Sequence, residues 1–323
     1  MGHGGQRRGV LRVNEFRDRG AVGTGGGLEE FAWGPPESFL GLPPDAAGLD
    51  TARVVILPVP YEATVSYMGG TRFGPRALLH ASRFVELYDH ELDAEPYRIG
   101  LHTLPELLLP ASGPEAALAV LRRAYDALLD LRKFVILLGG EHSVSGPPIL
   151  AHADRLGPRP LSVLQLDAHA DLRTEYEGTP FSHACVMHRV HERVRLVPVG
   201  IRSLTTGERA LARAKQIPII FGHELEDPAW IDRAVAALGP DVYVTVDVDF
   251  FDPAIMPSTG TPEPGGGSWQ PTMRLLERVF RERHVVGCDV VELAPIPGLA
   301  HADFLAAKLV AKLVGFHALA AAR

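Results

Sequence analysis

Acidic residues follow one another closely in YVTVDVDFFDP, residues 243–253. The stretch begins with strand-forming residues and then places Asp247, Asp249 and Asp252 in quick succession. A carboxylate that leaves water is heavily penalised unless it is paired or binds a metal. Asp247 and Asp249 therefore predict a cation at the end of a buried strand, whereas Asp252, which is followed by Pro253, is expected to belong to a turn.

Three further apolar runs end in groups of the same kind. They are FVILLGGEHSV (134–144) with Glu141 and His142, LSVLQLDAHADLR (161–173) with Asp167, His169 and Asp171, and VVGCDVVELAP (285–295) with Asp289 and Glu292. In a parallel sheet the carboxyl ends of the strands lie at one edge, where ligands bind. All four groups are therefore expected at the same edge.

The spacing predicts a metal site with both oxygen and nitrogen ligands. Residues i, i+2 and i+4 of an extended chain point to the same side, so the acids and histidines after each strand can converge if the chain stays extended. Two divalent ions would balance the four carboxylates, and an oxygen-rich set without thiolate favours Mn²⁺, with Zn²⁺, Co²⁺ and Ni²⁺ left open. The predicted metal ligands are His142, Asp167, His169, Asp171, Asp247 and Asp249.

Short apolar runs alternate with helical patterns from Arg53 onward, which predicts a parallel sheet with helices on both faces. Strands are expected at 53–59, 134–139, 161–167, 195–200, 217–221, 241–247 and 284–292, and helices at 113–133 and 230–238. Residues 1–50, rich in Gly and Pro, are expected to form a flexible N-terminal arm and an extended segment, and residues 51–323 a single catalytic domain. The apolar stretch 304–322 carries Lys308 and Lys312 and is expected to be a helix of the fold rather than a membrane span.

The composition limits the classes of partner and the compartment. A net charge of −7 argues against nucleic acid or an anionic membrane as the main partner. Cys185 and Cys288 are the only cysteines in the 323 residues, which suits a reducing cytoplasm. The expected protein is a soluble cytoplasmic one that acts on a small molecule.

Five ordered motifs together carry a resemblance to a known family. GGEHS, DAHADLR, SHACVM, DVDFFDPAIMPSTGTPEPGG and VVELAP resemble the ureohydrolase (arginase/agmatinase) superfamily, and its agmatinase branch in particular, from about residue 58 to the C-terminus. The resemblance implies a three-layer α/β/α sandwich on an eight-stranded parallel sheet, a homo-oligomer (trimer or hexamer) and two Mn²⁺ ions per chain. His142, Asp167, Asp171 and Asp247 would surround one ion, and Asp167, His169, Asp247 and Asp249 the other.

The resemblance also implies the reaction, the hydrolysis of a guanidino group to urea and an amine. A metal pair lowers the pKa of the attacking water. Glu292 would pair with the guanidinium, Asp171 would take a proton from the water and pass it to the leaving amine, and His183 in FSHACVM would shuttle protons at the cleft mouth. Glu292 could instead be a structural partner of an arginine, and Asp289 could serve a ligand histidine or only the core.

The substrate is the most open point. Arginases carry an Asn- and Ser-rich loop before the shuttling histidine, whereas this chain has RTEYEGTPFSHACV (173–186), so agmatine, cleaved to putrescine and urea, is expected first. N1-aminopropylagmatine is the alternative, and guanidinobutyrate or formiminoglutamate stay open with Arg173 or Arg189 as cationic partner. Outside the class stand a one-zinc deacetylase on the same fold and a catalytically silent binding homologue, which would be expected to lack a ligand.

Overall fold

The computed structural model describes residues 37–43, 46 and 48–322. Within them, eight strands form one parallel sheet in the order β2-β1-β3-β8-β7-β4-β5-β6. The strands are β1 (Val54–Val59), β2 (Leu101–Thr103), β3 (Phe134–Gly139), β4 (Leu161–Leu166), β5 (Arg195–Ile201), β6 (Ile220–Phe221), β7 (Asp241–Asp247) and β8 (His284–Val291). The parallel eight-stranded sheet is as predicted.

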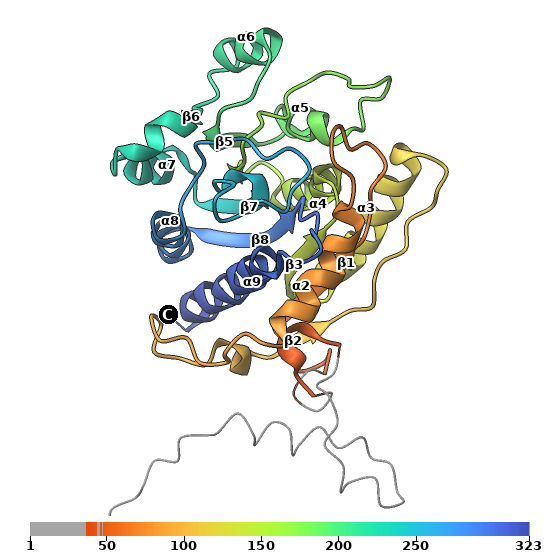
Figure 1. Cartoon of the computed structure of the whole chain (residues 1–323), viewed down its shortest axis with the longest axis vertical. Coiled ribbons are helices and arrows are strands. Elements are labelled where there is room, and N and C mark those ends of the chain that lie inside the picture. The colour runs from red at the N-terminus through yellow and green to blue at the C-terminus, as the bar shows by residue number, and fades with distance from the viewer. Residues whose placement is uncertain (1–36, 44–45, 47, 323) are drawn as a thin grey trace, which may run out of the picture.

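Helices cover both faces of the sheet and make a three-layer sandwich (Figure 1). One face packs on α2 (Gly74–Ser82), α7 (Trp230–Ala237), α8 (Trp269–Glu282) and α9 (Ala300–Ala321). The other packs on α3 (Pro114–Asp130), α4 (Gly146–Leu156), α5 (Val186–Val190) and α6 (Thr206–Ala214). Strands β1, β3, β4 and β7 are buried along their whole length, which explains their nearly continuous apolar sequences.

The predicted strands are confirmed in the centre of the sheet and less well at its edges. The strand expected at 217–221 is reduced to β6, because Pro218 has no N–H to donate to a neighbouring strand. Strand β2, which has only three residues, was not predicted from the sequence pattern. A strand of that length is too short to show a period of two.

Short 3₁₀ turns follow several strands and connect them to the helices. They are η2 (Phe39–Gly41), η3 (Thr71–Phe73), η4 (Pro96–Ile99), η5 (His142–Ser145), η6 (His183–Cys185), η7 (Gly222–Glu226) and η8 (Val248–Phe250). Three of these turns, η5, η6 and η8, contain residues that were singled out as candidates for chemistry. The chain therefore changes direction where the site residues lie.

The segment before β1 and the C-terminal helix α9 both contribute side chains to the core. The flexibility expected of the N-terminal arm concerns residues 1–36, which lie outside the described residues. Phe39 and Leu42, from the segment expected to be extended, are buried in the core beside α2. At the other end, α9 is long and apolar enough to cross a membrane, but it packs against α2 and α8 in the sandwich. It is a buried core helix, as predicted.

Candidate metal centre and active site

Four neighbouring strands in the middle of the sheet deliver the candidate residues. A candidate residue follows each of these strands within a few positions. His142 follows β3, Glu292 follows β8, Asp249 follows β7 and Asp171 follows β4. Because the strands are parallel, their carboxyl ends meet at one edge, and the side chains converge there. The predicted convergence at one edge of the sheet is therefore observed.

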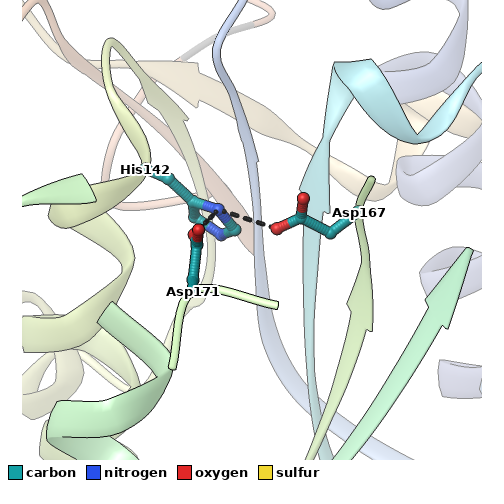
Figure 2. A group of neighbouring side chains, drawn as sticks. All are labelled: His142, Asp167 and Asp171. Atoms are coloured by element: carbon teal, nitrogen blue, oxygen red, sulfur yellow. Dashed lines mark ion pairs between the residues drawn. The ribbon is translucent and has the colours of Figure 1, made fainter. Parts of the chain in front are cut away.

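His142 lies at the centre of the first group of ligand atoms. Its Nδ1 is 3.1 Å from Asp167 Oδ2, 3.0 Å from Asp171 Oδ2 and 3.4 Å from Asp247 Oδ2. Figure 2 shows the His142 imidazole, from the segment after β3, and the carboxylates of Asp167 and Asp171, from the segment after β4, pointing toward one another. All four side chains are buried. A cation at their meeting point would satisfy them together.

The orientation of the His142 ring fits a metal ligand. Nε2 contacts Thr245 Oγ1 at 2.9 Å, and the Thr245 hydroxyl donates to Asp289 Oδ1 at 2.6 Å. Since Thr245 uses its proton on Asp289, Nε2 is the donor, and in the neutral imidazole that a metal binds this leaves the lone pair on Nδ1. Among the described residues Nδ1 has no hydrogen-bond partner, although carboxylate oxygens of Asp167, Asp171 and Asp247 lie 3.0–3.4 Å from it. A buried nitrogen lone pair ringed by oxygens is the arrangement that a metal ion would complete.

A second group of ligand atoms shares Asp167 with the first. His169 Nδ1 lies 2.8 Å from Asp249 Oδ2 and 3.8 Å from Asp167 Oδ1, and the ligand atoms of the three residues lie within 4.8 Å of one another. Gln165 Nε2 donates to Asp167 Oδ2 at 2.8 Å and holds that carboxylate between the two groups. Two adjacent sites with a common carboxylate are what a pair of metal ions requires.

The electrostatics of the cluster call for added positive charge. Burial raises the pKa of Asp167 to about 7, and repulsion from Asp171 and Asp249 adds to this. Burial likewise raises the pKa of Asp247 well above its usual range. Burial alone would lower the pKa of His169, but the neighbouring Asp249 carboxylate outweighs it and raises that pKa to about 11. Without cations these groups hold protons, and divalent ions that take the place of those protons fit carboxylate and imidazole donors.

The residues converge by turning rather than by staying extended, which corrects the geometry expected from spacing. Strand β4 ends at Leu166, and Asp171 has a positive φ of 53°. Strand β7 ends at Asp247, whose side chain accepts a hydrogen bond from the Asp249 N–H at 2.9 Å and begins the turn η8. The Asp167 and Asp247 carboxylates themselves help to bend the chain, because each accepts a hydrogen bond from the backbone N–H two residues further on.

A cleft with a volume of about 330 Å³ opens beside the two groups of ligand atoms. His169, Asp171, His183 and Glu292 are among the residues that line it. The three residues predicted to act on the substrate therefore face the same space, although they come from segments more than a hundred residues apart at the extremes.

Glu292 lines the cleft, and the backbone fixes one of its carboxylate oxygens. It has a positive φ of 65°, an unusual conformation for glutamate, and its Oε1 accepts the His142 backbone N–H at 2.6 Å. Burial raises its pKa well above its usual range, although the His142 N–H lowers it. No arginine pairs with it in the part of the chain that the structure describes, so the alternative of a structural ion pair finds no support there. One carboxylate oxygen is held in place and the other is left for a ligand.

Sequence reasoning missed the residues that support the cluster. Thr245 and Gln165 are polar residues two positions before Asp247 and Asp167 in otherwise apolar strands, and this period of two could have identified them. The segment after β1 was also missed. Its Thr64 and Ser66 contact His183, and β1 ends at the same sheet edge as the other strands.

Two other candidates are placed where the sequence suggested. Asp252 accepts hydrogen bonds from the N–H groups of Ala254, Gly265 and Gly266, which confirms that it belongs to a turn. Asp289 reaches His142 through Thr245, and it also accepts a hydrogen bond from the buried Tyr243 hydroxyl at 2.9 Å. The contacts expected for either of its two possible roles are therefore both present.

Known proteins resemble this chain over most of its length. Residues 52–315 match the arginase family. The N(1)-aminopropylagmatine ureohydrolase of Thermus thermophilus is 42% identical over 276 residues, which cover 84% of this chain and 92% of that protein. The agmatinase of Pyrococcus horikoshii is 34% identical over 270 residues, which cover 83% and 93%. The crystal structure of the agmatine ureohydrolase of Thermoplasma volcanium, 28% identical, superposes with a TM-score of 0.76 over 84% of this chain and 91% of that one. The chain therefore belongs to the arginase family, in its agmatinase-like group of ureohydrolases.

Proposed function

We propose that this protein hydrolyses the guanidino group of N1-aminopropylagmatine, releasing urea and spermidine, with two Mn²⁺ ions per chain. The observation that carries the proposal is that two groups of ligand atoms share Asp167 beside a cleft that also contains Glu292 and His183. Agmatine, the substrate expected first from the sequence, becomes the second candidate. The change follows from the relatives, since the aminopropylagmatine ureohydrolase is more similar (42%) than the agmatinase (34%).

The charge of the cleft supports a cationic substrate. Besides Arg173 and the histidines His169 and His183, its ionisable lining is acidic and includes Asp171, Glu208, Glu263 and Glu292. Arg189 does not line this cleft, and its guanidinium lies 4.2 Å from the ring centre of Phe181. Arg173 stacks over Tyr176 at 4.7 Å. A polyamine with several positive charges suits such a cleft better than guanidinobutyrate or formiminoglutamate.

The residues of this chain have distinct parts in the proposed reaction. When bound, the metal pair supplies positive charge to the buried carboxylates and lowers the pKa of water. Glu292 accepts hydrogen bonds from the guanidinium and orients its carbon, and the guanidinium charge keeps the buried carboxylate ionised. Asp171 takes a proton from the attacking water and passes it to the leaving amine. His183 exchanges protons between the cleft and solvent.

The alternatives outside the class make different demands. A one-zinc deacetylase would not need both groups of ligand atoms, and a silent homologue would be expected to have lost one of the ligands. All six predicted ligands are present, and His142 Nδ1 is near three of them. We also propose that the enzyme is cytoplasmic, in keeping with the free cysteines Cys185 and Cys288. We further propose that it is a homo-oligomer, a trimer or hexamer.

A urea-release assay on Mn²⁺-loaded protein tests the proposal. N1-aminopropylagmatine, agmatine, arginine and guanidinobutyrate are compared by kcat/KM, and the metal content per chain is measured in parallel. We expect the highest kcat/KM with N1-aminopropylagmatine and two Mn²⁺ per chain. A higher kcat/KM with agmatine would select the second candidate. Stoichiometric metal with no urea from any of the four would favour the silent homologue.

A further inference from the structure

Glu141 lies at the end of β3 and collects hydrogen bonds from the segment after β1. It is fully buried, and its Oε2 accepts the N–H groups of Ala63 at 2.5 Å and Thr64 at 2.7 Å. Its Oε1 accepts the hydroxyl groups of Thr64 at 2.7 Å and Ser143 at 2.6 Å. A carboxylate that accepts four such bonds acts only as an acceptor and holds the segment that contains Thr64.

The backbone beside Glu141 brings this segment close. A side chain on Gly140 would place Cβ 1.9 Å from the carbonyl oxygen of Tyr61, so only glycine allows the approach. The Glu141 N–H also donates to that carbonyl at 2.9 Å. The segment from Tyr61 to Thr64 is therefore fixed against β3 by its backbone as well as by the Glu141 carboxylate.

Thr64 connects Glu141 to the candidate proton shuttle. Its Oγ1 accepts the His183 backbone N–H at 3.0 Å and lies 3.2 Å from Nδ1 of the His183 ring. On the other side of the ring, Nε2 lies 2.9 Å from Oγ of Ser66, a residue that lines the cleft. The ring is held between the two hydroxyl groups.

Counting the available donors shows which atom carries each proton in the contacts that link Glu141, Thr64 and His183. A threonine hydroxyl has one proton, and Thr64 donates it to Glu141, so its oxygen can only accept from Nδ1 of His183. Ser182 Oγ, 3.3 Å from the same nitrogen, can accept as well. In a neutral imidazole a proton on Nδ1 leaves the lone pair on Nε2, toward Ser66 and the cleft.

We propose that Glu141 and Thr64 are positioning residues that hold His183 in the tautomer with its proton on Nδ1 and its basic nitrogen, Nε2, toward the cleft. The role of this tautomer in turnover rests on the proposed function, whereas the tautomer itself does not. A base whose lone pair already faces the substrate transfers protons without first rotating its ring or moving its own proton.

The test removes one hydroxyl and nothing else. Thr64→Val keeps the shape and the backbone N–H to Glu141, whereas Thr64→Ser restores the hydroxyl. Ser143→Ala is the matched control, because Ser143 also donates to Glu141 Oε1 but is not a contact of His183. The Nδ1 and Nε2 resonances of His183 in the Mg²⁺- or Zn²⁺-loaded protein report the tautomer, assigned by difference against His183→Gln, and kcat, KM and metal content are measured on the Mn²⁺ form.

We expect the Nδ1–H tautomer in the unaltered protein, in Thr64→Ser and in Ser143→Ala. Thr64→Val should show a mixture with Nε2–H and a kcat lower by about ten- to hundredfold, with KM and metal content nearly unchanged. An Nε2–H tautomer in the unaltered protein would overturn the proposal even if Thr64→Val did not fold. An unchanged tautomer and kcat in a folded Thr64→Val would overturn it too. If no guanidine is hydrolysed, the proposed function fails while the resonances still decide the tautomer.

Discussion

His142 Nε2 lies 2.9 Å from the hydroxyl oxygen of Thr245, and this contact directs the other ring nitrogen into the cluster of carboxylates. The hydroxyl is in turn held by Asp289 at 2.6 Å, so the orientation of the ring depends on a chain of three buried groups. Hydrogen bonds of this kind fix the ring and tautomer of metal-binding histidines.

Replacing Thr245 should therefore weaken metal binding without touching a ligand. Thr245→Val keeps the side-chain volume but removes the acceptor for Nε2, and we expect Mn²⁺ affinity to fall about 10- to 100-fold. Thr245→Ser, which retains the hydroxyl, is the control and should bind metal nearly as well as the unaltered protein. Competition with a metallochromic chelator measures both. Equal affinity in Thr245→Val would mean that the ring is held by packing alone.

Asp249 tests the second group of ligand atoms. Asp249→Asn removes the charge beside His169, which lies 2.8 Å away, and should reduce the bound metal to about one ion per chain and abolish nearly all turnover. The fold should persist, as judged by circular dichroism. Asp252→Asn is the control, because Asp252 contacts backbone N–H groups in a turn. Normal activity and two bound ions in Asp249→Asn would rule out the assignment.

The convergence of the acids and histidines could be predicted because such residues at the ends of apolar strands are costly and therefore conspicuous. The supporting contacts could not. Thr64 and His183 are 119 residues apart, and only the order of the strands in the sheet brings their segments together. The turns at Asp171 and Asp249 also escaped prediction, since a positive φ and a 3₁₀ turn leave no period in the sequence. Strand β2 gave no signal because it is three residues long.

His183 should affect the rate and not the metal. Its ring contacts Thr64 and Ser66, and it is absent from both groups of ligand atoms. We expect His183→Ala to lower kcat by about 10²-fold, within the usual range for a proton-transferring residue, and to bind two Mn²⁺ ions as before. Partial recovery of kcat by added imidazole would support proton transfer. Loss of metal in His183→Ala would place the residue among the ligands instead.

Removal of the metal should make stability depend on pH in one direction. In the metal-free protein burial raises the pKa of Asp167 from its usual 3.8 to about 7. The protonated carboxyl therefore adds to the free energy of unfolding, and this addition is fully present below pH 4 and is lost as the pH rises through 7. Asp249 raises the pKa of His169 from 6.5 to about 11 against the effect of burial. The stabilisation from protonated His169 is therefore fully present below pH 6.5 and is lost as the pH rises through 11. Both shifts have the same sign, and stability should fall from pH 5 to pH 8.

Thermal unfolding with and without chelator measures this effect. One unit of pKa shift corresponds to about 1.4 kcal/mol, so the Tm of the metal-free protein should fall by several degrees between pH 5 and pH 8. The Mn²⁺-loaded protein should change less over that range, because the ions bind the deprotonated ligands and stabilise the folded state. In metal-free Asp167→Asn, which has no proton to lose at that position, the slope should be shallower than in the unaltered protein. If the Tm of the metal-free protein instead rises with pH, the carboxylates do not repel one another in the folded state. The need of the cluster for a pair of metal ions would then lose its physical basis.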